Sequence, residues 1–229
     1  MTASASSTSA ASTSAASTSA ASTSAGRRPR VLVLDYGSGN LRSAERALAR
    51  VGADVTVSDD LDAALAADGL VVPGVGAYAA CMAGIDRLGA APVVRERVAA
   101  GRPVLGICVG MQVLYELGDE HGVRTDGLGV LPGEVRRLAA PILPHMGWNT
   151  VRPPAASALF AGLGADTRFY FVHSYAAKAD PDAGDTVGEH GEPFAAAVER
   201  GALAATQFHP EKSGDAGAHL LTNWLATLS

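Results

Sequence analysis

The sequence predicts a single α/β domain in which a mainly parallel central sheet is flanked by helices. Short apolar runs alternate with segments whose apolar residues recur every three or four positions, the pattern of repeated strand–helix units. Hydrophobic residues make up 48% of the chain and charged residues 18%, so the chain can bury a substantial core. The part beyond the first 26 residues has the size of one domain, roughly 200 residues.

The first 26 residues differ in composition from the rest. From Ser7 to Ala25 the sequence repeats Ser-Thr-Ser-Ala-Ala, which has almost no side chain large enough to offset the entropy lost on ordering. We therefore expect a disordered tail at residues 1–26 and a folded domain at residues 27–229. An organelle transit peptide is disfavoured because the segment has no amphipathic apolar face.

The first strand–turn–helix unit is the clearest. Val31–Leu34 is an apolar run typical of a buried strand, Gly37 and Gly39 permit a turn, and apolar residues then follow at helical spacing from Leu41 to Val51. The same patterns predict further strands at Asp54–Val57, Leu70–Val72 and Val104–Ile107, and helices at Leu61–Ala66, Tyr78–Leu88, Val93–Ala99 and Met111–Leu117.

Beyond Gly129 the pattern changes to shorter strands separated by turns. Strands are predicted at Gly133–Leu138, Phe169–Val172, Ala195–Glu199 and Leu203–Gln207, and a closing helix at His219–Leu228.

Composition and charge exclude several classes of function. The net charge of −5 without a dense Lys/Arg run argues against nucleic acid, and the lack of a long apolar run argues against a membrane span. Two cysteines without CxxC spacing favour a reducing compartment, and we expect the cytoplasm. Five histidines are scattered without ligand spacing, so we expect no metal and no cofactor: His121, His145, His173, His190 and His219.

Cys108 is the candidate nucleophile. The run Gly106-Ile107-Cys108-Val109-Gly110 joins a predicted strand to a predicted helix, as in a nucleophile elbow. Glycines let neighbouring segments approach closely there, and a helix N-terminus favours thiolate over thiol. A buried structural cysteine is the alternative, and it is the better interpretation for Cys81, which lies in a small-residue helical stretch.

A base and an orienting carboxylate follow the strand Leu203–Gln207. In His209-Pro210-Glu211 the proline favours extended backbone at His209, where residues two apart project to the same side. A carboxylate bonded to one imidazole nitrogen stabilises the imidazolium that forms when the other nitrogen takes a thiol proton. By itself the motif is also compatible with a surface turn.

Pro73–Ala77 is a glycine-rich loop after a predicted strand. Its backbone N–H groups, together with one beside the nucleophile, can form an oxyanion hole. A dinucleotide fingerprint over Gly74–Ala79 is disfavoured, because no acidic residue ends a following strand at the required distance.

These motifs resemble the triad-type, class I glutamine amidotransferases, whose fold is flavodoxin-like. GICVGMQ around Cys108 and HPEKS from His209 to Ser213 carry the resemblance. Four more motifs are similar to those of the glutaminase subunits of imidazole glycerol phosphate synthases: DYGSGN at Asp35–Asn40, PGVGAY at Pro73–Tyr78, PHMGWN at Pro144–Asn149 and YFVHSY at Tyr170–Tyr175.

The resemblance implies a reaction and a partner. Cys108 would attack the side-chain amide of glutamine, and ammonia would pass to a (β/α)₈-barrel cyclase subunit. That subunit would form imidazole glycerol phosphate and aminoimidazole carboxamide ribonucleotide in histidine biosynthesis. The oxyanion and substrate residues would be Gly74, Val75, Gly76, Val109, Gln112, Glu120, Ser174 and Tyr175, and the partner-facing residues Asn40, Trp148 and Lys212.

Three alternatives remain at this stage. The chain could be the glutaminase of another ammonia-channelling complex, such as one for pyridoxal phosphate, against which PHMGWN and PEKS argue. It could be a free-standing thiol hydrolase, or a binding subunit that has lost its activity. Intact Cys108, His209 and Glu211 disfavour the last alternative.

Overall fold

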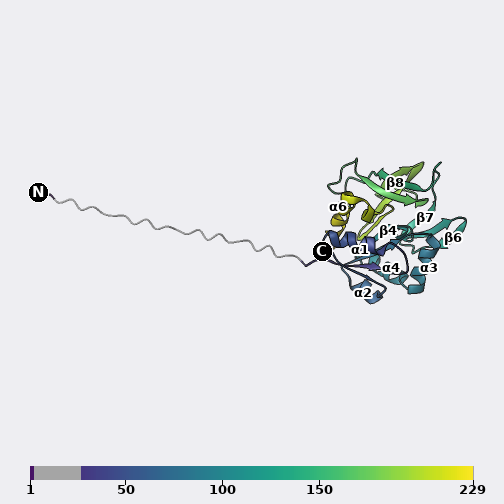
Figure 1. The fold of residues 1–229 in the computed structure, drawn as a ribbon, viewed down its shortest axis with the longest axis horizontal. Helices are drawn as coiled ribbons and strands as arrows, with labels where there is room; N and C mark the ends of the chain where they lie inside the picture. Colours follow the sequence, from purple (N-terminus) through teal and green to yellow (C-terminus); the bar gives the residue numbers. More distant parts are fainter. Residues whose placement is uncertain (3–26, 229) are drawn as a thin grey trace.

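The computed structural model describes residues 1–2 and 27–228, so most of the predicted tail lies outside the described residues. A seven-stranded sheet forms the centre of the domain, with β4 inside it (Figure 1). Its strand order is β11-β12-β13-β4-β3-β1-β2. The strands from β2 to β13 in this order pair in parallel, whereas β12 and β11 are antiparallel, which confirms the mainly parallel sheet. Their bounds are β1 Arg30–Leu34, β2 Asp54–Ser58, β3 Gly69–Gly74, β4 Val104–Cys108, β11 Thr186–His190, β12 Glu192–Arg200 and β13 Leu203–Thr206.

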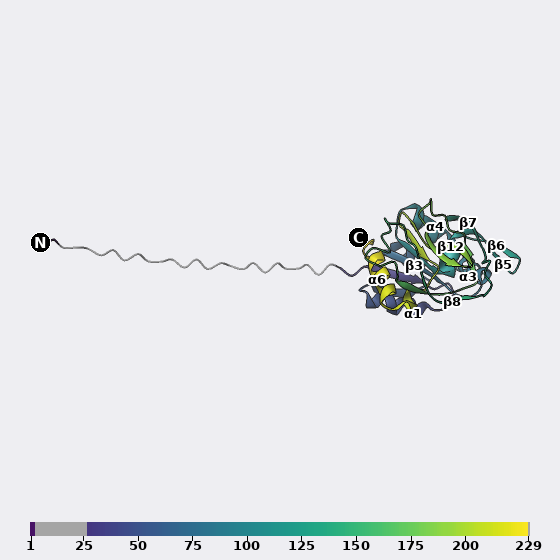
Figure 2. The same ribbon diagram turned by 90° about the horizontal axis from the view of Figure 1, so that it is seen from above.

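Helices cover both faces of this sheet. The helix α1 packs against α6, and α2 packs against α4. Right-handed crossovers place α1 and the α2–α4 group on opposite faces, and Figure 2 shows β3 between α1 and α4. In the described part of the chain, no helix has the length and apolar character needed to cross a membrane. The helices are α1 Leu41–Arg50, α2 Leu61–Ala66, α3 Tyr78–Leu88, α4 Ala91–Ala99 and α6 Gly214–Leu225.

Two smaller sheets lie beside the central one. A four-stranded sheet has the order β10-β7-β5-β6, and β8 pairs with β9 as an antiparallel hairpin. Two one-turn helices, α5 and η1, complete the elements of the described residues. Bounds are β5 Tyr115–Glu120, β6 Val123–Asp126, β7 Leu131–Arg137, β8 His145–Thr150, β9 Arg168–His173, β10 Tyr175–Ala177, α5 Val109–Gln112 and the 3₁₀ helix η1 Pro210–Lys212.

Most predicted elements are confirmed, and two need correction. The helix predicted at Met111–Leu117 is wrong, because α5 ends at Gln112 and Tyr115 begins β5. Pairing of β5 with β6 and β7 overrides the local apolar spacing. The closing helix begins at Gly214 rather than His219 and follows η1 almost directly. The sequence patterns also missed β5, β6, β8, β10 and β11.

Glycines around Cys108 allow β3, β4 and α5 to approach closely. A Cβ on Gly74 would lie 2.4 Å from Gly110 N, and one on Gly106 would lie 2.8 Å from Gly110 O. A Cβ on Gly110 would lie 1.9 Å from Val72 O. Each of these contacts is with backbone, which cannot move aside cheaply. The strand-to-helix turn therefore depends on the absence of side chains at these positions.

Gly110→Ala is expected to lower the free energy of unfolding by about 3 kcal/mol, because its Cβ would overlap the backbone of β3. For a domain of this size the melting temperature would fall by about 6–12 °C. Gly164→Ala is the matched control, since its Cβ would meet nothing within 4 Å. Thermal unfolding followed by circular dichroism compares the two, and equal melting temperatures would contradict the close approach.

Candidate active site

The site lies where three adjacent parallel strands end. In the sheet β4 pairs with β3 on one side and β13 on the other, with Gly74 opposite Cys108 and Ile107 opposite Thr206. The carboxyl ends of parallel strands lie at one edge, where α/β folds place their ligands. The loop after β3, the residue that ends β4 and the segment after β13 therefore meet.

Cys108 has the strained backbone expected of a nucleophile in an elbow. Its φ is 56° and its ψ is −115°, a region that residues other than glycine rarely adopt. The side chain is buried but lines a cavity. The expected helix-dipole contribution to the thiolate is small, because α5 is a single turn of four residues.

His209 and Glu211 form a buried pair beside Cys108. His209 Nδ1 lies 2.6 Å from Glu211 Oε1, and both side chains are 1% exposed. The prediction of continuous extended backbone is wrong beyond His209, because Pro210 begins η1 and the pair closes across this turn. Asn40 Nδ2 donates to the same Oε1 at 2.6 Å, a contact that the sequence did not reveal.

The His209 segment is held from several sides. Its backbone N–H donates to Tyr170 O at 2.9 Å, and Ser213 Oγ donates to His209 O at 2.6 Å. The preceding Phe208 is fully buried and stacks on Phe169 with ring centroids 4.3 Å apart. These contacts fix the imidazole in the direction of Cys108.

The electrostatics of the site favour an imidazolium at His209. Burial would lower the pKa of His209, but hydrogen bonds to Cys108 and Glu211 and their negative charges outweigh it and raise the pKa to about 9. With Nδ1 directed at Glu211, Nε2 is the nitrogen available to Cys108. The arrangement can therefore supply an activated thiolate and a proton donor together.

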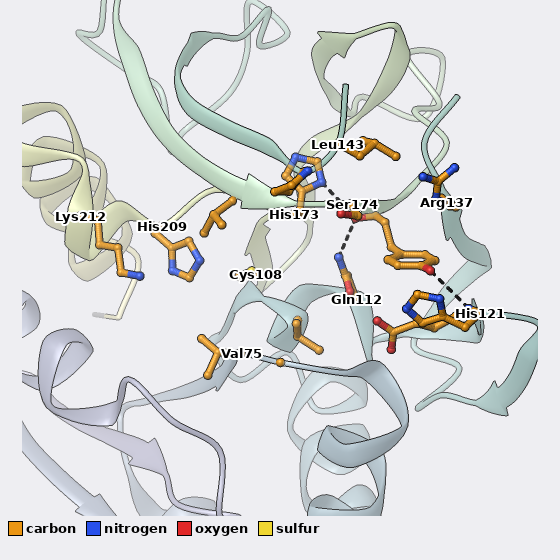
Figure 3. Close-up of a pocket in the computed structure, with 16 residues that line it drawn as sticks. Val75, Cys108, Gln112, His121, Arg137, Leu143, His173, Ser174, His209 and Lys212 are labelled. Atoms are coloured by element: carbon orange, nitrogen blue, oxygen red, sulfur yellow. Dashed lines mark hydrogen bonds between the residues drawn. The ribbon is translucent and has the colours of Figure 1, made fainter. Parts of the chain in front are cut away.

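A cavity of about 570 Å³ opens in front of Cys108 (Figure 3). Val75 lies on one side of Cys108, with His209 and Lys212 on a second side and Gln112 and His121 on a third. Gly74, Asn40 and Trp148 are not among the lining residues; Gly74 packs against the backbone of α5 instead. Predicted residues that line the cavity are Val75, Gly76, Cys108, Val109, Gln112, Glu120, Ser174, Tyr175, His209 and Lys212.

The backbone N–H group of Val75 points away from the cavity. Its N–H donates to Ser38 Oγ at 3.2 Å. Its carbonyl accepts from Cys81 Sγ at 3.5 Å, so the buried Cys81 predicted as structural has a definite partner. Gly76, which follows, has a φ of 87°. In this conformation Val75 offers no N–H to a ligand of Cys108.

Two predicted substrate residues already have protein partners. Glu120 Oε2 accepts from Tyr78 N at 2.8 Å, at the start of α3. Gln112 Nε2 donates to Tyr175 O at 2.8 Å and to Gln207 Oε1 at 2.9 Å, so both of its hydrogens are used. The sequence missed further residues of the site, among them Gln207 and the lining residues His121, Arg137, Leu143, Pro144, Val172 and His173.

Three of the histidines expected to be scattered come together. The pairing of β8 with β9 places His145 opposite His173, and His145 Nδ1 lies 2.9 Å from His173 Nε2. His190 stacks on His145 with ring centroids 4.2 Å apart. Sequence separation hid this cluster, because only the pairing of distant strands creates it.

Trp148 lies on the surface. It is 53% exposed, and its ring contacts Tyr170 edge to face at 5.9 Å. Met146, two residues earlier on the same side of β8, is 62% exposed, and Ile142 is 73% exposed. This face of the β8–β9 hairpin therefore points outward.

Comparison with known families agrees with the fold. The model of the family described as glutamine amidotransferase class-I matches residues 32–228. The chain belongs to the class-I glutamine amidotransferase family. The resemblance drawn from the motifs is thereby confirmed.

Similar relatives are named imidazole glycerol phosphate synthase subunit HisH. The one from Mycobacterium bovis is 66% identical over 198 residues, which cover 85% of this chain and 96% of the relative. The one from Nocardia farcinica is 64% identical over 211 residues, which cover 88% and 99%. The one from Thermobifida fusca is 62% identical over 210 residues, which cover 88% and 100%.

Solved structures support the fold. A crystal structure of a glutamine amidotransferase matches with a TM-score of 0.67 at 24% identity, covering 86% of this chain and 98% of that one. The structure of PurLQS from Thermotoga maritima gives a TM-score of 0.68 at 22% identity, covering 89% and 100%. At these identities the likeness concerns the fold alone.

His209 is expected to titrate near pH 9, above the ordinary histidine value of 6.5. Because the folded-state pKa is raised, the stability that the charged ring contributes is complete below pH 6.5 and is lost as pH rises through about 9. Glu211→Gln removes one negative neighbour and should lower the midpoint by about one unit. The exposed Glu96→Gln should not change it. Nuclear magnetic resonance titration of the ring nitrogens measures both, and a midpoint near 6.5 in the unmodified protein would contradict the ion pair.

Proposed function

We propose that this chain is the glutaminase subunit of an imidazole glycerol phosphate synthase and acts in histidine biosynthesis. The observation that carries the proposal is the convergence of Cys108 with the His209–Glu211 pair at one cavity. The proposal is supported by 66% identity to a relative named as subunit HisH of that synthase. No other ammonia-channelling complex is favoured by a feature of the site.

The proposed chemistry begins with Cys108 Sγ attacking the side-chain amide carbon of glutamine. The tetrahedral intermediate collapses when the carbon–nitrogen bond breaks, and His209 gives its proton to the departing nitrogen, which leaves as ammonia. Neutral His209 then takes one proton from water, whose oxygen attacks the thioester carbon. The carbon–sulfur bond breaks, the carboxylic acid leaves and loses its proton to solvent as glutamate, and Cys108 is restored as the thiolate beside the imidazolium of His209. Glu211 stabilises the imidazolium through the Nδ1 contact.

We assign the amino-acid end of glutamine to the far side of the cavity. Glu120 carries a carboxylate that suits the α-amino group, and Ser174 and Tyr175 line the same cavity. Gln112 keeps only its carbonyl oxygen for a ligand while Tyr175 O and Gln207 hold its hydrogens. Contact between Gln112 and the α-carboxylate would therefore require this amide to exchange a partner.

The ammonia acceptor in this proposal is a (β/α)₈-barrel cyclase subunit. It would form imidazole glycerol phosphate and aminoimidazole carboxamide ribonucleotide from the ammonia and a nucleotide substrate. The exposed Trp148 and Lys212 and the nearby Asn40 would face it. Because the nucleophile is a free thiol, we place the complex in a reducing compartment, the cytoplasm.

Cys108→Ala is expected to lower glutamine-dependent product formation by roughly 10⁴-fold or more, because the other free cysteine of the described residues, Cys81, does not line the cavity. Added ammonium salt should still give product at the normal rate, which shows that the variant folds and assembles. The measurement is cyclase turnover in the complex with either nitrogen source. Glutamine-dependent turnover that survives in this variant would remove Cys108 from the mechanism, and a chain that never supports a cyclase would favour a free-standing hydrolase.

The idle state of the site is proposed to depend on the Val75 peptide. In an active site, the N–H groups of Val75 and Val109 would donate to the oxyanion of the intermediate. The Val75 N–H is instead bonded to Ser38, and the glycines at 74 and 76 on either side of Val75 permit the Gly74–Val75 peptide to turn over. One missing donor lowers the rate by roughly 10² to 10³, so the isolated chain would hydrolyse glutamine slowly until the partner releases this peptide.

Ser38→Ala removes the acceptor that holds the Val75 N–H, so it should raise the basal glutaminase rate of the isolated chain by about fivefold. Stimulation by the nucleotide-bound cyclase should shrink by the same factor, because the final active state is shared. Ser43→Ala, an exposed serine on α1, serves as the control. Steady-state glutaminase assays of the isolated chain and the complex decide the point. An unchanged basal rate would show that Ser38 does not restrain the loop.

A further inference from the structure

Gln207 is a buried polar residue that the proposed mechanism does not use. It lies between the end of β13 and His209, its backbone N–H donates to Ala196 O at 2.9 Å, and the residue is 1% exposed. Its side-chain Nε2 lies 3.8 Å from Cys108 Sγ, and its Oε1 accepts from Gln112 Nε2 at 2.9 Å. The amide therefore spans the space between the nucleophile and Gln112.

The direction of the Gln207 amide follows from its neighbours. The carbonyl oxygen of Tyr175 can only accept, so the group that Gln112 directs at it, 2.8 Å away, must be its NH₂. The second hydrogen of that NH₂ goes to Gln207. Gln207 must meet it with its oxygen, since the reverse orientation would oppose two NH₂ groups. The NH₂ of Gln207 is thus directed at the sulfur of Cys108.

The same carbonyl fixes a second branch of the network. His173 Nδ1 lies 3.0 Å from Tyr175 O and must donate, so His173 Nε2 accepts from His145 Nδ1 at 2.9 Å. His145 Nε2 then accepts from Asn149 Nδ2 at 3.2 Å. Burial lowers the pKa of His173 to about 3 and that of His145 to about 4, which keeps both rings neutral donors and acceptors. The orientation of Tyr175 O is therefore held from two sides.

An N–H directed at a sulfur favours the thiolate over the thiol. Cys108 also interacts electrostatically with the titratable groups of His209, Tyr36 and Cys81. Burial raises the pKa of Tyr36 and of Cys81, so both remain neutral at neutral pH. Among these groups only His209 can supply positive charge, and Gln207 adds a neutral donor from a different direction.

We propose that Gln207 stabilises the thiolate of Cys108 through its side-chain N–H, and that Gln112, anchored on Tyr175 O, is the positioning residue that imposes this direction. The inference extends the proposed glutaminase function, but it concerns the protonation of the thiol and can be tested without glutamine. It gives the nucleophile a second stabilising partner besides His209.

The test compares Gln207→Met, which keeps the length of the side chain without a donor, with Gln207→Glu, which directs a carboxylate at the sulfur. Iodoacetamide alkylation of Cys108 is measured across the titration range of a thiol by peptide-resolved mass spectrometry, with Cys81 in the same molecule as the internal reference. At neutral pH the rate should fall about tenfold in Gln207→Met and further in Gln207→Glu. The plateau rate at alkaline pH should stay unchanged, because access to the sulfur is the same.

Two results would overturn the proposal: an unchanged pH profile in both variants, or a lower plateau with an unchanged midpoint, which would indicate a change of access. If Gln207→Met does not fold, Gln112→Met provides the second measurement, with a smaller shift of the midpoint in the same direction expected. No shift in that variant would also count against the proposal. Absence of glutaminase activity in the unmodified complex would remove the proposed function and leave the alkylation result intact.

Discussion

The parallel pairing of β4 with β3 and β13 is the constraint on which the site depends. It places the ends of three strands at one edge, so Cys108, the Val75 loop and His209 meet although they are far apart in sequence. The turn into α5 can pack directly on β3 and β4 because Gly74, Gly106 and Gly110 carry no side chain. A change of register by one residue would turn Cys108 to the other face of the sheet and separate it from His209.

The sequence predicted the first half of the fold well because its signals there are local. Helices α2 and α3 have the bounds that apolar spacing indicated, and Asp60 caps α2 by accepting from the N–H groups of Asp62 and Ala63. The second half depends on pairing between distant strands. Met111–Leu117 has helical spacing, yet the segment from Tyr115 onward joins β6 and β7, a choice that no local pattern contains.

The candidate site divides in the same way. Cys108 and His209 stand in short motifs whose chemistry can be inferred from residue type and spacing. The geometry of the His209–Glu211 pair could not be inferred in this way, because the 3₁₀ helix η1, and not an extended strand, brings the two side chains together. Ser38, Gln207 and His173 gave no signal because each is a common polar residue whose role arises from one distant partner. The exposure of Trp148 likewise depends on which side of β8 faces outward.

The two halves of the proposed mechanism, the charged His209 and the oxyanion donor at Val75, differ in how far the resting structure prepares them. At His209 burial favours the neutral ring, and only the nearby sulfur and the Glu211 carboxylate, held by Asn40, reverse this preference. The charged pair of His209 and Glu211 thus exists without any ligand. The oxyanion donor does not stand ready, because Ser38 holds the Val75 N–H. On the proposed mechanism, control of hydrolysis therefore belongs to the loop after β3 rather than to the nucleophile, since turning one peptide costs far less than separating a buried ion pair.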